Sequence, residues 1–264
     1  MSAPVFYIAD PDLQQVQVGQ EIPLAGTEGR HAVSVLRVNI GEVIELVDGR
    51  GLRVHGTVVR VSGKENLWVR VSKVLIEPIA PLHITVVQAL PKGEHGELAI
   101  DLLTQVGVDV IVPWAAARSI TKWAPDRLEK ARSKWQAAVT AAAKQARRAR
   151  WPVLGEVATT AQVAEIIAGA SSGAGAAIVL YEEAITPLLE VPIPDRGGAI
   201  EVVLIVGPEG GIGEDERAIF RAAGAFEARL GPSVLRSSAA GAVATAVLSA
   251  TRNWGRPPVG GSTL

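Results

Sequence analysis

The stretch EVVLIVGPEGGIGEDE (201–216) indicates the fold of much of the chain. Its first part, 201–207, is an apolar run of the kind found in parallel strands that are covered on both faces. A glycine-rich turn from Gly207 to Gly213 then leads into an acidic helix start at Glu214. Strand, turn and helix in this order are typical of α/β sheets. Because such sheets bind ligands beyond the carboxyl ends of their strands, this turn is a candidate site.

The alternation of strands and helices extends over the second half of the chain. Hydrophobic patterns predict strands at 84–90, 108–114, 177–183, 201–207 and 225–231, and helices at about 94–106, 125–150, 160–169, 213–224 and 238–254. We therefore predict an α/β sheet domain over residues 79–264.

Residues 1–78 have a different pattern, in which short strands alternate with turns. Asp48-Gly49 and Ser62-Gly63 mark two hairpins, and residues 29–38 form a helical pattern between strands. This pattern predicts a small β-barrel-like domain.

The composition favours a folded protein that has neither disulfides nor a metal centre. Of the 264 residues, 48% are hydrophobic and 20% are charged, a balance typical of globular domains. The sequence has no cysteine, and its histidines show no metal-ligand spacing, so we expect no metal cofactor. No apolar stretch is long enough to span a membrane, and the N-terminus lacks a signal-peptide pattern. We expect a soluble cytoplasmic protein without a membrane partner.

Charge is unevenly distributed, although the net charge of the chain is only −1. Residues 118–150 contain ten basic and two acidic side chains, a local charge of +8. Such a run is either a solvated helix face or a surface that contacts nucleic-acid phosphates.

The turn at Gly207–Gly213 is not a known phosphate-binding motif. No Gly-Lys-Ser/Thr follows it, and Gly211-x-Gly213 lacks the third glycine of a dinucleotide fingerprint. The acidic helix start at Glu214 would repel a phosphate, so a neutral or cationic small ligand fits better. The alternative is a strand-to-helix turn that binds nothing.

A second unusual loop precedes the last helix. Arg236 stands there among apolar and hydroxyl residues, where a buried cation would need an anionic partner, so we expect it to face a site. The helix that follows carries small residues on nearly every face, which suits close packing either inside the domain or across a subunit interface.

These two loops together resemble the signature of a known family. GPEGGIGEDE (207–216) and LGPSVLRSSAAGAVATAVL (230–248) are similar to the C-terminal motifs of the RsmE family, bacterial methyltransferases that modify N3 of a uridine in 16S ribosomal RNA. The resemblance covers nearly the whole chain. Residues 30–51 are similar to the family's PUA-type RNA-binding domain, and residues 89–119 to the opening of its catalytic domain.

The resemblance implies a fold, a cofactor and a partner. RsmE proteins belong to the SPOUT superfamily, whose α/β catalytic domain ties its C-terminal segment into a trefoil knot. It therefore implies a knotted domain behind a PUA-like β-barrel, a homodimer, and S-adenosylmethionine held by the knot loops. By position, we expect the cofactor to contact Leu180, Tyr181, Val206, Gly207, Pro208, Glu209, Gly210, Gly211, Leu230, Gly231, Val234 and Leu235.

The implied reaction is attack of a uracil N3 on the sulfonium methyl group. Arg236 is the candidate that stabilises the negative charge on the flanking oxygens. Glu209 by position and His31 by chemistry are candidates for the base, whose identity stays open. The implied partner is 16S RNA in the small ribosomal subunit or its precursor, and the candidate RNA-binding residues are Arg30, His31, Arg37, Lys92, Arg118, Arg147, Arg148 and Arg150.

The chain also departs from the family pattern. Ser237-Ser238-Ala239 stands where the family usually has an acidic residue between two threonines. Ser233 replaces a frequent arginine, and Leu102 and Gln105 replace a common lysine and glutamate. Two alternatives remain: another SPOUT enzyme that acts on transfer RNA or a ribose 2′-hydroxyl, and a non-catalytic RNA-binding factor in ribosome assembly.

Overall fold

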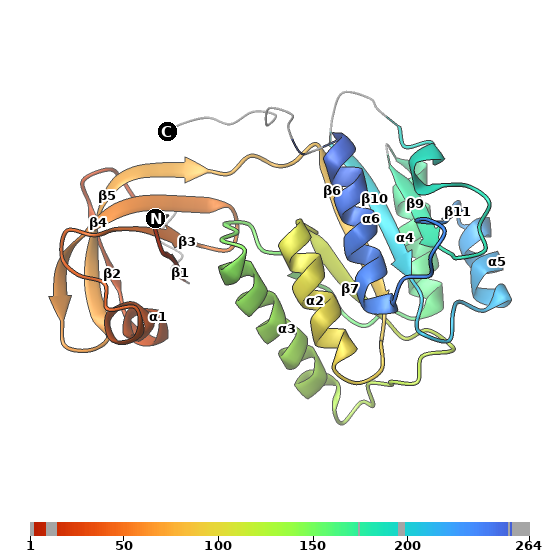
Figure 1. Ribbon diagram of the computed structural model, residues 1–264, viewed down its shortest axis with the longest axis horizontal. Coiled ribbons are helices and arrows are strands. Elements are labelled where there is room, and N and C mark those ends of the chain that lie inside the picture. The colour runs from red at the N-terminus through yellow and green to blue at the C-terminus, as the bar shows by residue number, and fades with distance from the viewer. Residues whose placement is uncertain (1–2, 9–14, 174, 195–198, 253, 255–264) are drawn as a thin grey trace. The chain divides into compact units, whose positions relative to one another are not determined.

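The computed structural model describes residues 3–8, 15–173, 175–194, 199–252 and 254. These residues form two compact units, shown in Figure 1. Among the described residues, unit 1 consists of those up to Pro78 together with Ala143–Trp151, and unit 2 consists of Ile79–Ala142 and the described part of 152–254. As functional domains, 1–78 and 79–264 stay a prediction.

Unit 1 is built on a five-stranded sheet with the strand order β1-β3-β4-β5-β2. Its strands are β1 (Val5–Tyr7), β2 (Glu21–Leu24), β3 (Val43–Val47), β4 (Leu52–Ser62) and β5 (Asn66–Ile76). β1 pairs with β3 in parallel, and the other pairs are antiparallel. The predicted hairpins at Asp48-Gly49 and Ser62-Gly63 are confirmed, because they join β3 to β4 and β4 to β5.

The helical pattern of unit 1 and its core also follow from the sequence. A short helix α1 (Gly26–Arg30) continues into a π-helical turn η2 (His31–Val35), which overlaps the predicted helical segment. Along β4, buried and partly exposed residues alternate, as expected for a strand with one face on a core. That core contains Phe6, Leu46 and Val54.

Unit 2 contains a six-stranded sheet in the order β11-β9-β10-β6-β7-β8, in which all neighbouring strands are parallel. The strands are β6 (Leu82–Ala89), β7 (Val110–Trp114), β8 (Val153–Leu154), β9 (Ala176–Leu180), β10 (Ile200–Val206) and β11 (Phe226–Ala228). β6 and β10 lie at its centre and are almost entirely buried, which explains their continuous apolar sequences.

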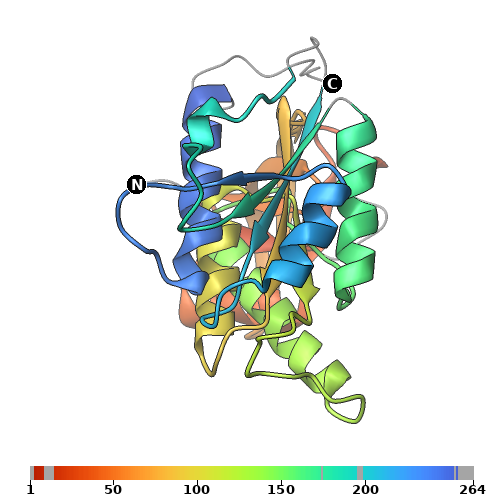
Figure 2. The ribbon, with the colours of Figure 1, turned by 90° about the vertical axis from the view of Figure 1, so that its right-hand side faces the viewer.

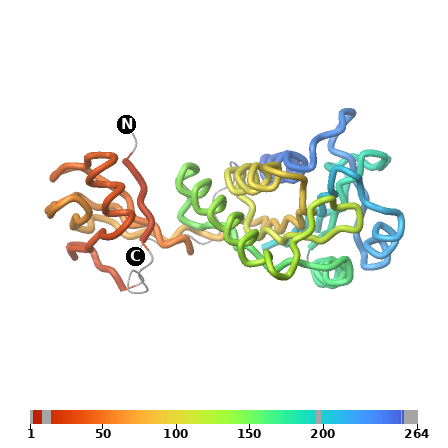
Figure 3. Tube along the Cα trace, turned by 90° about the horizontal axis from the view of Figure 1, so that it is seen from below, coloured from red at the N-terminus to blue at the C-terminus, as the bar shows by residue number. Residues whose placement is uncertain are grey.

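Helices cover both faces of this sheet, as Figure 2 shows. One face packs against α2 (His95–Val106), the first part of α3 (Leu128–Gln145) and α6 (Ser237–Arg252). The other face packs against α4 (Thr160–Ser172) and α5 (Glu214–Ala222). In the trace of Figure 3, α2 and α6 run next to each other. A 3-10 turn, η3 (Leu188–Glu190), lies in the loop between β9 and β10.

The long helix predicted at about 125–150 is shorter than expected. α3 ends at Gln145, and Arg147 takes a left-handed conformation with φ of 53°. The amides of Arg147 and Arg148 donate to the carbonyls of Lys144 and Ala143, which closes the last turn. Residues 146–151 lie outside the helix, and the last of them, Trp151, precedes Pro152, a position that disfavours helical geometry.

Candidate active site

Three loops meet at the carboxyl edge of the unit 2 sheet and enclose a pocket of about 380 Å³. They follow β9, β10 and β11, and the last of them leads into α6. This is the edge at which the sequence predicts a ligand, because the carboxyl ends of parallel strands lie together. The volume lies within the range of about 300–1,000 Å³ that is usual for small-molecule sites.

Most of the residues predicted to contact a cofactor line this pocket. They are Leu180, Tyr181, Val206, Gly207, Pro208, Glu209, Gly211, Val234 and Leu235, and Arg236 lines it with them. Leu230 and Gly231 line a smaller hollow of about 70 Å³, which shares Leu180 and Tyr181 with the main pocket. Gly210 is not among the lining residues, and its carbonyl accepts a hydrogen bond from Arg118. The functional roles of these residues stay predictions.

Six further residues line the pocket that the sequence analysis did not name as contacts, namely His95, Glu182, Ile212, Ser237, Ser238 and Ala240. Glu182 and Ser237 directly follow predicted residues, so the motif positions alone could have identified them. His95 belongs to α2, which follows β6. Only the strand order, in which β6 is the neighbour of β10, brings His95 to this edge.

Ser237 connects two elements at the base of the pocket. Its hydroxyl donates to the carbonyl of Gly207 at 2.6 Å and accepts from Nε2 of Gln88 at 3.1 Å. Gln88 is completely buried in β6. The serine that departs from the family's threonine therefore holds the start of α6 to the ends of β6 and β10.

The loops on the other side of the pocket are also tied together. The backbone amide of Lys92 donates to the carboxylate of Glu209 at 3.3 Å. The hydroxyl of Thr121 donates to the carbonyl of Pro91 at 2.7 Å. Arg118 reaches the carbonyl of Gly210 at 3.3 Å. These bonds place two predicted RNA-binding side chains, Lys92 and Arg118, beside the glycine-rich loop, where both are exposed.

At the acidic start of α5, Glu214 is paired with arginines and Glu216 is buried and hydrogen-bonded. Glu216 is only 5% exposed, and its carboxylate accepts from Ala117 N at 2.9 Å, Thr160 Oγ1 at 3.0 Å and Gly213 N at 3.3 Å. It therefore caps the helix and fixes the neighbouring loops. Glu214 pairs with two arginines of the same helix, and the hydrogen bond from Arg221 lowers the pKa of Glu214 below its ordinary value.

Tyr181 is held at the edge of the pocket by its neighbours. The guanidinium of Arg217 lies 3.9 Å from the centre of the phenol ring, and Arg217 in turn pairs with Glu227 at 3.2 Å. The phenol donates to Glu183. That hydrogen bond raises the pKa of Tyr181 above its ordinary value, so the phenol stays protonated at neutral pH.

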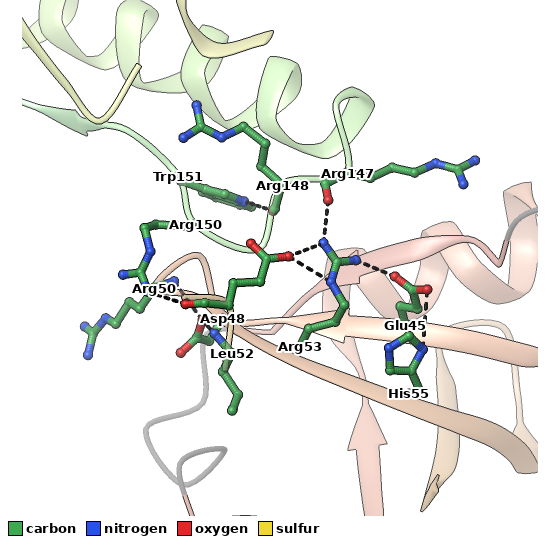
Figure 4. Close-up of polar contacts among 11 residues, drawn as sticks. Glu45, Asp48, Arg50, Leu52, Arg53, His55, Arg147, Arg148, Arg150 and Trp151 are labelled. Atoms are coloured by element: carbon green, nitrogen blue, oxygen red, sulfur yellow. Dashed lines mark hydrogen bonds and ion pairs between the residues drawn. The ribbon is translucent and has the colours of Figure 1, made fainter. Parts of the chain in front are cut away.

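In unit 1, the structure separates the three arginines at 147, 148 and 150 (Figure 4). Arg150 packs against Gly51 and donates to the carbonyl of Glu77 at 3.0 Å, so it holds residues 143–151 against the sheet. The carbonyl of Arg148 accepts from the indole of Trp151 at 2.9 Å. The side chain of Arg147 is exposed, whereas Arg148 and Arg150 are half-buried. Of the three, Arg147 has the most exposed side chain, and its role in RNA binding stays a prediction.

A polar cluster fixes the position of Arg147. Its carbonyl accepts from Nη2 of Arg53 at 2.7 Å. Arg53 also pairs with Glu77 at 2.7 Å and with Glu45 (Figure 4). Burial opposes the charge of Arg53, but hydrogen bonds to Glu77 and Glu45 outweigh it and raise the pKa of the guanidinium.

The other RNA-binding candidates of unit 1 lie in or just after its helical segment. Arg30 ends α1, His31 begins η2, and Arg37 follows with φ of 55°. All three are exposed. The ring of His31 packs edge-on against Phe6, with centroids 6.0 Å apart, which fits a structural role for this histidine. Its candidacy as the base stays a prediction, and the pocket of unit 2 contains another histidine, His95.

Two expected absences concern the part of the chain that the structure describes. Within it, no three histidine, cysteine, aspartate or glutamate side chains come close enough to hold a metal ion. None of the helices in the described ranges has the length and apolar character needed to cross a membrane.

Both units match known families of RNA methyltransferase domains. Residues 78–249 match the RNA methyltransferase domain family, and residues 24–72 match the RNA methyltransferase PUA domain family. The ribosomal RNA small subunit methyltransferase E of Mycobacterium tuberculosis is 40% identical over 257 residues, which are 96% of this chain and 94% of that protein.

Two solved structures have the same fold. A methyltransferase from Legionella pneumophila, in complex with the bound cofactor SAM, is 26% identical, with a TM-score of 0.79 over 95% of this chain and 98% of that chain. The ribosomal RNA small subunit methyltransferase E from Neisseria gonorrhoeae, bound to S-adenosyl methionine, is 24% identical, with a TM-score of 0.82 over 97% and 100%. The predicted SPOUT-type α/β domain with a PUA-like barrel is confirmed, while the trefoil knot itself stays a prediction. On this agreement of motifs, fold and relatives, the chain belongs to the ribosomal RNA small subunit methyltransferase E family.

Proposed function

We propose that this protein transfers a methyl group from S-adenosylmethionine to N3 of a uridine in 16S ribosomal RNA of the small ribosomal subunit. The observation that carries the proposal is the pocket at the carboxyl edge of the unit 2 sheet. It is formed by the same loops that contain the family motifs, in a chain that is 40% identical to a relative named for this class of activity.

The residues of the pocket fit S-adenosylmethionine. Leu180, Val206 and Ile212 supply apolar walls, and the loop at Gly207 brings the backbone close to a ligand. The carboxylates of Glu182 and Glu209 suit the positive charge of a sulfonium group. When bound, the cofactor supplies the methyl group as a good electrophile.

Arg236 is the residue best suited to act on the uracil. It lines the pocket, it is exposed, and it immediately precedes Ser237, which anchors the start of α6. As N3 loses its proton, the flanking carbonyl oxygens gain negative charge, and a guanidinium beside them stabilises that charge. Glu209 has a different task, because its carboxylate holds the backbone of Lys92.

RNA is bound through exposed basic side chains in both units. Lys92 and Arg118 stand beside the pocket loops, and Arg30, Arg37 and Arg147 are exposed in unit 1. Phosphate contacts of this kind give affinity that falls with salt. The target base must leave its stack to reach a pocket of this size.

The active form is proposed to be a homodimer. The outward face of α6 is apolar, with Val243 39% exposed and with Ala239, Ala246 and Ala250 in register at helical spacing. Leu98 of the neighbouring helix α2 is 45% exposed. A face of small apolar residues allows two helices to approach closely. Light scattering should give twice the chain mass, and Val243→Glu should give the monomer.

Arg236→Ala and Arg236→Lys test the proposal for this residue. With 16S RNA or small subunits, we expect Arg236→Ala to lower kcat by about 10²–10³-fold, the cost of losing one donor to developing charge, while the Kd for S-adenosylmethionine changes little. Arg236→Lys should recover part of this loss. Full turnover of Arg236→Ala would remove the assigned role.

The product distinguishes this function from its rivals. In an assay with labelled S-adenosylmethionine, labelled methyl groups in a transfer RNA or in a ribose 2′-O-methyl nucleoside would favour another SPOUT activity. Saturable RNA binding without release of S-adenosylhomocysteine would favour an assembly factor, which the Ser237-Ser238-Ala239 departure makes worth testing. A cytoplasmic location belongs to this proposal, since the substrate is ribosomal RNA.

A further inference from the structure

The reaction releases one proton, and the pocket must contain a group that takes it. Attack by N3 forms the N3–CH3 bond, the CH3–S bond breaks with its electron pair going to sulfur, and the N3–H proton is left over. The acceptor must be unprotonated at neutral pH and must lie in the same pocket as the reacting atoms.

Few of the described pocket residues meet these requirements. Tyr181 stays protonated and donates to Glu183, so it does not accept a proton. Ser237 uses its hydroxyl to bridge Gly207 and Gln88. The carboxylate of Glu209 accepts from the Lys92 amide. The remaining titratable side chains able to accept a proton are His95 and Glu182.

Their chemistry favours the histidine. A general base works best when its pKa is near the working pH, and an imidazole ordinarily titrates between about pH 5 and 8. An ordinary carboxylate, with a pKa near 4, is a much weaker base for an imide N–H. His95 is half-buried and Glu182 is exposed, so the imidazole is the less solvated of the two.

The start of α2, which carries His95, is held by contacts of the residues on both sides of it. It begins α2, and the next residue, Gly96, packs against the indole of Trp135. The loop just before the helix is held by Thr121 at Pro91 and by Glu209 at Lys92. The loop that leads to His95 is therefore held beside the glycine-rich loop that forms a wall of the pocket.

We infer that His95 is the general base of the reaction and removes the N3 proton of uracil as the methyl group is transferred. This inference rests on the proposed function. After transfer, the imidazolium gives its proton to solvent and the neutral base is restored. Arg236 then stabilises the oxygens of the uracil anion, and Glu209 is a positioning residue that keeps the start of α2 beside the glycine-rich loop.

Several charged groups lie in the same pocket as His95 or on the same segment of the chain. From the other elements of the pocket these are Glu182, Glu209 and Arg236. The loop and helix that carry His95 add Lys92, Glu94 and Glu97, of which Glu97 pairs with Lys134 at 3.8 Å. Replacements of His95 should therefore leave these groups in place.

The test compares wild type, His95→Gln and Glu182→Gln in turnover with small subunits, each over a pH series. His83→Gln is the matched control, because His83 lies at the amino end of β6, away from the carboxyl edge. We expect His95→Gln to lower kcat by about 10²–10⁴-fold with little change in KM or in the Kd for S-adenosylmethionine, and to lose the limb of the pH profile near neutrality. Added imidazole should partly restore kcat of His95→Ala.

The outcomes separate this inference from the proposed function. If wild type releases S-adenosylhomocysteine with RNA and His95→Gln keeps kcat within threefold and the same pH limb, the assignment of His95 is wrong and the function stands. A large loss in Glu182→Gln with an intact His95→Gln would move the role to Glu182. Wild type without RNA-dependent turnover would overturn both.

Discussion

Replacement of Gly207 by alanine should distort the pocket, because the backbone there has no room for a side chain. A Cβ at this position would lie 2.6 Å from Cγ1 and 3.3 Å from Cδ1 of Ile212. Ile212 is 6% exposed and is packed into the core under α4 and α5, so it cannot move aside freely. The glycine-rich loop must shift instead, and the carbonyl of Gly207 then moves away from Ser237.

The expected cost is that of overpacking, about 1–3 kcal/mol. If this strain arises only in the complex with S-adenosylmethionine, the affinity for S-adenosylmethionine drops about 5- to 150-fold. If it falls on folding, the melting temperature of unit 2 drops by about 2–4 °C for each kcal/mol. Calorimetric titration with S-adenosylmethionine and thermal unfolding of the same variant measure both parts.

Gly169→Ala is the matched control. Gly169 lies in α4, is exposed, and has open space where a Cβ would be. The same substitution there should leave cofactor affinity unchanged and raise helix stability slightly. Affinity of Gly207→Ala within twofold of wild type, together with an unchanged melting temperature, would refute the reasoning about this loop.

Three further predictions concern residues outside the pocket. Glu216→Ala removes the buried carboxylate that accepts hydrogen bonds from three donors. It should lower the free energy of unfolding, measured by urea denaturation, by about 1–3 kcal/mol for each donor left unpaired. A total loss below about 1 kcal/mol would contradict this prediction. Arg147→Gln should weaken RNA binding and make the slope of log K against log salt concentration shallower by about 1. Arg70→Gln should change this slope less, because Arg70 is already in an ion pair. An unchanged slope in Arg147→Gln would show that Arg147 does not contact RNA. Because Arg221 lowers the pKa of Glu214, this carboxylate stabilises the fold above the ordinary glutamate pKa near 4.3 and ceases to do so as the pH falls through its lowered pKa; Glu214→Gln should flatten that part of the melting-temperature profile, and an unaltered profile would argue against the pair.

The sequence predicted those features that depend on local patterns. The apolar run 201–207 became β10, the glycine-rich turn became a wall of the pocket, and the two hairpin turns joined the expected strands. Each of these follows from neighbouring residues, since strand burial and turn geometry are determined over a few positions.

Other features depend on contacts between distant segments. His95 reaches the pocket only because β6 lies beside β10, and no spacing in the sequence indicates that order. From the sequence, Arg150 had the same predicted role as Arg147 and Arg148, yet Arg150 packs against Gly51, about a hundred positions away in the chain. The pairing of Glu214 with Arg217 could have been predicted from the sequence, because residues three apart on a helix lie on the same face.

The central claim is tested most directly by the identity of the methylated nucleoside. Small subunits and naked 16S RNA from cells that lack this protein would be incubated with it and with labelled S-adenosylmethionine, digested, and separated as nucleosides. The account predicts that the label appears in 3-methyluridine at one site. It predicts far less label when the pocket is altered, as in Arg236→Ala. Label in any other nucleoside, or RNA binding without transfer of label, would contradict it.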